Sequence, residues 1–259
     1  MIAQAIRNHP RAVIPYVTAG LPDLDSTGRI LSALKDAGAA AIEIGIPFSD
    51  PMADGPVLQK ASHLALQAGF RMDDLFGRLG QWSAKIDIPL IVMSYINPLM
   101  RRGLHDTLAR LKDGGVKGVI IPDLPVEAKG IHADCAAVGI DLIRLVAPTT
   151  VPERTREILA QCGGFVYAVA VKGVTGQRAS LPEGLQGQVA FLKANTELPV
   201  CVGFGVSKAS QVDELLGFAD GVIVGSYLMD EVMKASDPAA AAGRALRILV
   251  NGVPRSGQG

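Results

Sequence analysis

The sequence predicts an α/β fold, a single (β/α)8 barrel of the TIM type spanning residues 1–259. Short apolar runs rich in Val and Ile alternate with amphipathic segments about eight times along the chain. Each unit takes roughly 30 residues, with no linker or compositional break between units. The length of 259 residues and the 49% hydrophobic content suit one large core. A doubly wound open sheet is the alternative, because periodicity alone does not show that a sheet closes.

Eight segments are expected to be strands covered on both faces, since nearly continuous apolar runs are typical of buried parallel sheets. In chain order they are Ala12–Thr18, Ala41–Ile46, Pro89–Ser94, Gly118–Ile121, Leu142–Val146, Phe165–Val171, Val200–Phe204 and Gly221–Val224.

Helical spacing of apolar residues predicts helices between these strands. A short extra helix is expected after Gly225 and before the last helix, and Ile2–Arg7 are expected to form a short helix that closes the barrel bottom. Pro152 suits a first helical turn, and Ser207 is a predicted N-cap. The other predicted helices are Asp25–Ala37, Gln59–Gln67, Met72–Ala84, Thr107–Lys112, Glu127–Val138, Pro152–Cys162, Ser207–Leu216 and Ala239–Val250.

Composition narrows the class of protein. Lys plus Arg and Asp plus Glu are both 25, so no overall positive field indicates nucleic acid or a lipid surface. The three cysteines are far apart and outside any zinc spacing, which predicts reduced thiols and no metal site. No uncharged run approaches the ~18 residues of a membrane span. We therefore expect a soluble, cytoplasmic protein whose partner is a small molecule or another protein.

The stretch from Glu43 to Pro56 is the predicted active site. Glu43 interrupts an apolar strand, and Asp50 and Asp54 follow in a turn rich in Gly and Pro. In a barrel, function lies at the carboxyl ends of the strands. A partly desolvated Glu43 would have a raised pKa suited to acid/base work, whereas Asp54 is expected to be more solvated, to stay ionised and to accept a substrate N–H. Alternatively, Glu43 pairs with a lysine inside the barrel and Asp54 only caps a turn.

Glycines at the ends of the seventh and eighth strands predict a phosphate site. Barrels of this type commonly bind phosphate with the loops after strands seven and eight and with the N-terminus of a short helix. Gly203-Phe-Gly205 and Gly225-Ser226 let backbone approach an anion closely, and Ser226 adds a hydroxyl. A phosphorylated substrate is therefore predicted, although a glycine that ends a strand is often only a turn residue.

At these residues the sequence resembles the tryptophan synthase alpha subunit family. The resemblance implies a (β/α)8 barrel that cleaves indole-3-glycerol phosphate, by a retro-aldol reaction, to indole and glyceraldehyde 3-phosphate in the last steps of tryptophan biosynthesis. It implies no cofactor and no Schiff base. The motifs that carry it are Glu43 to Gln59, Tyr16-Val-Thr-Ala-Gly20, Asn97-Pro98, Asp123-Leu-Pro-Val-Glu127, Gly173-Val-Thr-Gly176, Gly203-Phe-Gly-Val-Ser207 and Val224-Gly-Ser226.

The resemblance also implies residue roles. Glu43 matches the family's catalytic acid/base, and Asp54 matches the carboxylate that accepts the indole N–H. Tyr167 matches an active-site tyrosine, but it is equally consistent with barrel core. Thr175 matches a threonine that contacts the second carboxylate when the loops close. The residues that match the phosphate site are Gly176, Gly205, Gly225 and Ser226.

A partner and two mobile loops follow from the same resemblance. The family's alpha subunit binds a pyridoxal phosphate-dependent beta subunit, as an expected alpha2-beta2 heterotetramer, and passes it indole. Closure of loops Pro47–Gln59 and Lys172–Leu185 is expected to raise activity.

Two departures from the family pattern leave alternatives open. Lys172 stands where a small hydroxyl residue is expected, and Arg101-Arg102 follows the third strand where an aromatic residue is common. A lysine at the end of the sixth strand would allow a Schiff-base sugar-phosphate aldolase. A free-standing indole-releasing lyase would share every catalytic residue, and a regulatory subunit with vestigial chemistry is a third possibility that retention of both carboxylates argues against.

Overall fold

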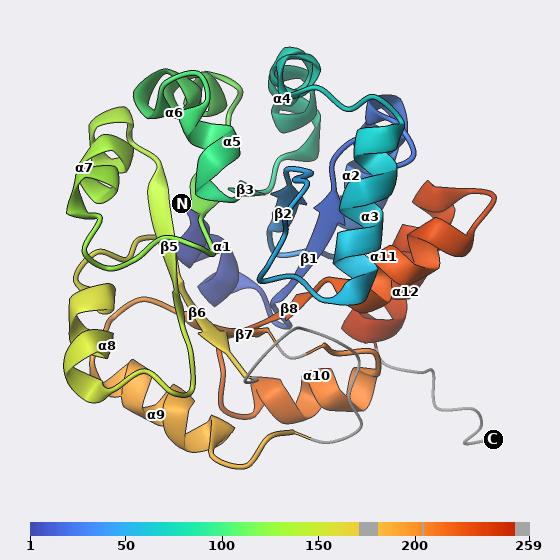
Figure 1. The fold of residues 1–259 in the computed structure, drawn as a ribbon. Coiled ribbons are helices and arrows are strands. Elements are labelled where there is room, and N and C mark those ends of the chain that lie inside the picture. Colours follow the sequence, from blue (N-terminus) through green and yellow to red (C-terminus); the bar gives the residue numbers. More distant parts are fainter. Residues whose placement is uncertain (171–180, 204, 252–259) are drawn as a thin grey trace, which may run out of the picture.

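The structure, a computed structural model, describes residues 1–170, 181–203 and 205–251, in which eight parallel strands close into a barrel (Figure 1). Neighbouring strands pair in chain order, and β8 returns to pair with β1. Closure excludes the open-sheet alternative and confirms the predicted (β/α)8 barrel. The strands are β1 Val13–Thr18, β2 Ile42–Gly45, β3 Leu90–Met93, β4 Gly118–Ile120, β5 Asp141–Val146, β6 Val166–Val169, β7 Val200–Gly203 and β8 Gly221–Val224.

Helices surround the strands, so each strand is covered on its outer face (Figure 1). The short extra helix before the last one is α11, as predicted. The described helices are α1 Ile2–Asn8, α2 Leu24–Asp36, α3 Pro56–Gln67, α4 Met72–Ile86, α5 Ile96–Met100, α6 Leu104–Asp113, α7 Lys129–Val138, α8 Pro152–Leu159, α9 Leu185–Ala194, α10 Ala209–Leu216, α11 Ser226–Lys234 and α12 Pro238–Asn251.

The core has two parts, because successive strand residues point to opposite faces. The larger cluster lies between strands and helices. The smaller cluster fills the barrel interior and includes Ile14, Ile91 and Ile143. Helix α1 closes the bottom with the fully buried side chains of Ile2 and Ile6, which confirms the expected N-terminal helix.

Several element boundaries differ from the predictions for local reasons. Helix α10 begins at Ala209, and Ser207 is not its N-cap. The N–H groups of Ser207 and Lys208 instead donate to the Gln211 side-chain oxygen at 2.9 and 3.1 Å. Helix α7 begins two residues after Glu127, because a tight turn precedes it in which the Lys129 N–H donates to the Glu127 carbonyl at 2.8 Å. The predicted ends of strands six and seven, Val171 and Phe204, lie outside the described residues.

Among the helices described, none combines the length and the apolar character that crossing a bilayer requires. Cys135, Cys162 and Cys201 are unpaired, and burial raises the pKa of each thiol. Within the described ranges, no three His, Cys, Asp or Glu side chains are grouped so that they could hold a metal ion.

Candidate active site

A cavity of about 650 Å³ opens at the carboxyl ends of the strands. Every candidate site residue that the structure describes lines it: Glu43, Asp54, Tyr167, Gly205, Gly225 and Ser226. Thr175, Gly176 and Lys172 lie outside the described residues. The barrel therefore brings residues on β2 and β6, and residues that follow β2, β7 and β8, to one hollow.

Glu43 lies on β2 and faces the barrel interior. Its side chain is 1% exposed, and Oε1 has no hydrogen-bond partner among the described residues. Desolvation raises the pKa of Glu43 to about 8. The described part of the chain provides no lysine that pairs with it, so the alternative of a buried ion pair finds no support there. At neutral pH this carboxyl group holds its proton and can act as an acid.

Asp54 is not solvated, contrary to the expectation from its place in a loop. The loop folds back over the cavity, where the Asp54 N–H donates to the Pro51 carbonyl at 3.0 Å and the Gln59 amide donates to the Asp54 carbonyl at 2.9 Å. The side chain is 6% exposed, and burial raises its pKa to about 6, opposed by a hydrogen bond with the Tyr95 side chain. Asp54 thus remains ionised above about pH 6 despite its burial.

Tyr95 is a site residue that sequence reasoning missed. It follows β3, and its hydroxyl accepts the Ala53 N–H at 2.8 Å beside the hydrogen bond with Asp54. Its ring stacks on Phe48 with centroids 5.2 Å apart. The Asp123 carboxylate accepts the next N–H along the chain, that of Ile96, at 3.0 Å. The sequence feature that could have identified Tyr95 is its position directly after a strand end, where barrels place functional side chains.

We expect Tyr95→Phe to weaken catalysis about tenfold in kcat/KM, because it removes two hydrogen bonds that hold the Asp54 loop. Loss of the bond to the carboxylate should also raise the pKa of Asp54 and shift the acid side of the pH profile upward. Steady-state kinetics across pH checks this. Tyr227→Phe is the matched control, since Tyr227 lies on α11 and, among the described residues, its hydroxyl makes no hydrogen bond to the Asp54 loop. Unchanged kinetics in Tyr95→Phe would contradict the proposal that Tyr95 holds the Asp54 loop in place.

Two more tyrosines lie over glycines of the next strand. Tyr16 on β1 is in register with Glu43, and a Cβ on Gly45, two residues further along β2, would clash with the Tyr16 hydroxyl. Tyr167 on β6 has the same relation to Gly203 on β7, where a Cβ would clash with the Tyr167 hydroxyl. A side chain at either glycine would therefore displace a tyrosine from the cavity wall.

The part of the cavity at the ends of β7 and β8 offers backbone to an anion. Gly205 has φ +78, a conformation that glycine adopts without strain. Gly225 is the N-cap of α11, and Ser226, 4% exposed, is its first residue. Free N–H groups and the helix dipole make such an N-terminus favourable for phosphate.

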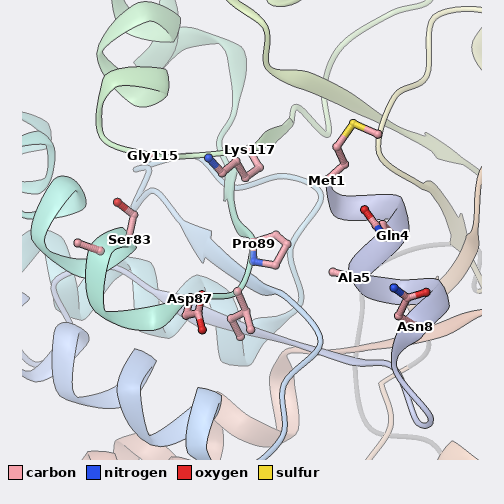
Figure 2. A pocket seen from close by; sticks show the side chains of 11 residues that line it. Met1, Gln4, Ala5, Asn8, Ser83, Asp87, Pro89, Gly115 and Lys117 are labelled. Atoms are coloured by element: carbon pink, nitrogen blue, oxygen red, sulfur yellow. The ribbon is translucent and has the colours of Figure 1, made fainter.

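A second hollow, of about 520 Å³, lies at the other end of the barrel, between α1 and the segments that lead into β3 and β4 (Figure 2). Its charged side chains, Asp87 and Lys117, are exposed. It contains neither of the candidate carboxylates.

Comparison with known proteins identifies related sequences along nearly the whole chain. The family profile of the tryptophan synthase alpha chain matches residues 2–253. The tryptophan synthase alpha chain of Carboxydothermus hydrogenoformans is 44% identical over 221 residues, covering 85% of this chain and 83% of that protein. That of Chloroflexus aggregans is 42% identical over 248 residues, covering 94% and 93%.

Solved structures agree with the sequence comparison. A chain of Mycobacterium tuberculosis tryptophan synthase superposes with a TM-score of 0.87 at 34% identity, covering 96% of each chain. A chain of the tryptophan synthase complex from Pyrococcus furiosus gives a TM-score of 0.85 at 35% identity, covering 93% of this chain and 98% of that one.

Proposed function

Because this chain belongs to the tryptophan synthase alpha chain family, we propose that Glu43 and Asp54 divide the work of cleaving indole-3-glycerol phosphate between them. The chain is the subunit that cleaves this substrate, a carbon–carbon lyase of tryptophan biosynthesis. The products are indole and glyceraldehyde 3-phosphate.

Glu43 moves the protons. Protonated at neutral pH, it donates to C3 of the indole ring, and the bond between C3 and the adjacent glycerol carbon then breaks. The hydroxyl on that carbon loses its proton as the aldehyde forms, and the Glu43 carboxylate accepts it, which restores the acid. The burial of Glu43 and its pKa of about 8 support this role.

Asp54 stabilises charge. Protonation of C3 leaves positive charge on the indole nitrogen, and a fixed carboxylate that accepts the N–H lowers the energy of that state. Asp54 is ionised above about pH 6 and is held in place by its loop and by Tyr95. A preorganised charge in a water-poor cavity acts more strongly than it would in water.

The phosphate end orients the substrate. Gly205, Gly225 and Ser226 would hold the phosphate at the start of α11, together with Gly176. Tyr167 would form the wall beside the acid/base, where Gly203 makes room for its hydroxyl. Thr175 would contact Asp54 when the loops close, as the family resemblance implies.

This proposal rests on three groups around one cavity: a buried carboxyl that has no ion-pair partner among the described residues, a carboxylate held by its loop, and a helix N-terminus. A Schiff-base aldolase using Lys172 is not favoured, because the relatives named above are tryptophan synthase alpha chains.

A beta subunit is the expected protein partner, since similar structures come from tryptophan synthase complexes. We propose an alpha2-beta2 assembly in which the beta subunit carries pyridoxal phosphate and receives the indole. We also propose that residues 1–259 form one domain and that the protein works in the cytoplasm, where its three unpaired thiols would stay reduced.

Indole release from indole-3-glycerol phosphate, assayed with and without a cognate beta subunit, tests these proposals. We expect slow release by the chain alone and a rise on adding the partner, because closure of the catalytic loops completes the site. Absence of release in both conditions would overturn the catalytic proposal. Release that does not respond to the partner would overturn the proposed activation and favour a free-standing lyase.

A further inference from the structure

We propose that Tyr16 is a positioning residue for the reaction, whose hydroxyl donates a hydrogen bond to the Asp54 carboxylate in the substrate-bound enzyme. The inference rests on the proposed function of Asp54. Tyr16 lines the catalytic cavity, and the mechanism above assigns it no role.

The position of the Tyr16 hydroxyl follows from strand register. Tyr16 on β1 is opposite Glu43 on β2, and both line the cavity. Alternate residues of a strand face the same side, so Gly45 also faces inward, one step closer to the loop that carries Asp54. The hydroxyl fills the space that a Gly45 side chain would take, since a Cβ there would clash with it. The hydroxyl therefore lies above Glu43, on the side of Asp54.

Among the described residues, the hydrogen-bond pattern leaves the Tyr16 proton available. The buried Thr18 hydroxyl donates to the Tyr16 oxygen at 3.4 Å, so Thr18 uses an acceptor position and not the Tyr16 hydrogen. Tyr16 is 5% exposed, which leaves the cavity as the direction for that hydrogen. A buried hydroxyl gains from donating to a charged acceptor.

Asp54 has room for a second donor. A carboxylate accepts about four hydrogen bonds, and Tyr95 provides one from the loop side. Tyr16 would hold the carboxylate from the barrel side and leave another lone pair for the indole N–H. Burial, and then the charge of Asp54, raise the pKa of Tyr16, so it remains a donor over the working pH range.

Other titratable groups face the same point, and the experiment must separate them. Apart from Tyr16 and Asp54 themselves, those in the described part of the chain are Glu43 on β2, Tyr95 after β3 with Asp123 behind it, and Tyr167 on β6.

The test is Tyr16→Phe, measured as kcat and KM for indole-3-glycerol phosphate between pH 5 and 9 in the presence of the beta subunit. Because a hydrogen bond to the ionised carboxylate would be lost, the acid limb near pH 6 should move to higher pH. We expect kcat at pH 7 to fall about three- to tenfold, with KM changed less than twofold and the alkaline limb unchanged. Tyr95→Phe should differ by raising KM, since it also releases the loop backbone.

Two further measurements make the result decisive. Tyr16→Phe placed in an Asp54→Asn background should cause no further loss, because the hydroxyl then has no carboxylate to hold. Carboxyl ¹³C NMR of Asp54 should report the same upward pKa change even in a variant of low activity. Tyr227→Phe serves as the control for removing a tyrosine hydroxyl.

Several outcomes would overturn the inference: an unchanged acid limb, a shift of the alkaline limb alone, which would place the hydroxyl on Glu43, or an equal loss in the Asp54→Asn background. Wild-type protein that releases no indole would instead overturn the proposed function, so the two failures are distinguishable.

Discussion

Glu43→Gln should abolish most activity and at the same time make the protein more stable at neutral and alkaline pH. Gln keeps the shape of the side chain but cannot donate a proton to indole C3 or recover one from the glycerol hydroxyl. General acid–base catalysis contributes about 10²–10⁴-fold, so kcat for indole release should fall by that factor. KM should change little, because the residues proposed to hold the phosphate, Gly205, Gly225 and Ser226, lie on other elements around the cavity.

The gain in stability follows from the pKa of Glu43. The folded-state pKa of about 8 is above the ordinary value of 4.5. Between these two values the unfolded chain has released the proton and the folded chain retains it, so wild-type stability falls as pH rises through this window. The slope is about 1.4 kcal/mol per pH unit, so the total penalty above about pH 8 is on the order of 5 kcal/mol. Glu43→Gln removes this penalty because its side chain does not ionise.

Urea unfolding of wild type and Glu43→Gln at pH 5 and at pH 8.5 measures the effect. The difference between their free energies of unfolding should be small at pH 5 and should favour the variant at pH 8.5. Glu153→Gln is the matched control, since Glu153 is exposed on α8 and should change neither activity nor the pH dependence of stability. A constant difference between wild type and Glu43→Gln across this range would contradict the proposed burial of a titrating Glu43.

Asp54→Asn is expected to lower kcat/KM by about 10²–10³-fold, the usual cost of removing a preorganised group that stabilises transition-state charge. The amide can still occupy the position, but it carries no negative charge to offset the positive charge on the indole nitrogen. The loss should appear mainly in kcat, because the charge develops only as C3 is protonated.

The pH profile distinguishes this role from a structural one. The active form needs Asp54 ionised and Glu43 protonated, so wild-type kcat/KM should be bell-shaped, falling below about pH 6 and above about pH 8. In Asp54→Asn the acid limb should disappear while the alkaline limb remains. Asp50→Asn is the control in the same loop, where the Asp50 carboxylate is exposed and accepts the Ser49 hydroxyl. If the acid limb persists in Asp54→Asn, the titration of another group must cause it.

Much of the fold was predictable because buried parallel strands and amphipathic helices leave strong periodic patterns. Each of the eight expected strands is present; β8 has the predicted bounds, and the ends of several others are shifted by one residue. Boundaries were less predictable where a side chain from the next turn decides them, as Gln211 does at the start of α10. The short helix α5 was not predicted, since five residues are too few to show a helical period.

Within the site, the identities of the two carboxylates and of the glycines at the late strand ends followed from the sequence. Motif and position at strand ends were sufficient to select them, and their catalytic roles remain predictions. The environment of Asp54 did not follow, because its solvation depends on a loop that folds back over the barrel mouth. The sequence assigned no role to Tyr16 or Tyr95, because both are proposed to act on Asp54, which is far from each of them in the sequence.

The sequence by itself determined the barrel, the family and the residue types at the strand ends, because local pattern and motif encode these. Only the tertiary structure decided that Glu43 has no described ion-pair partner, that Asp54 is buried against Tyr95, and that Gly45 makes room for the Tyr16 hydroxyl. Solvation, pKa and hydrogen bonding depend on which distant segments surround a group, and closure of the sheet fixes those neighbours.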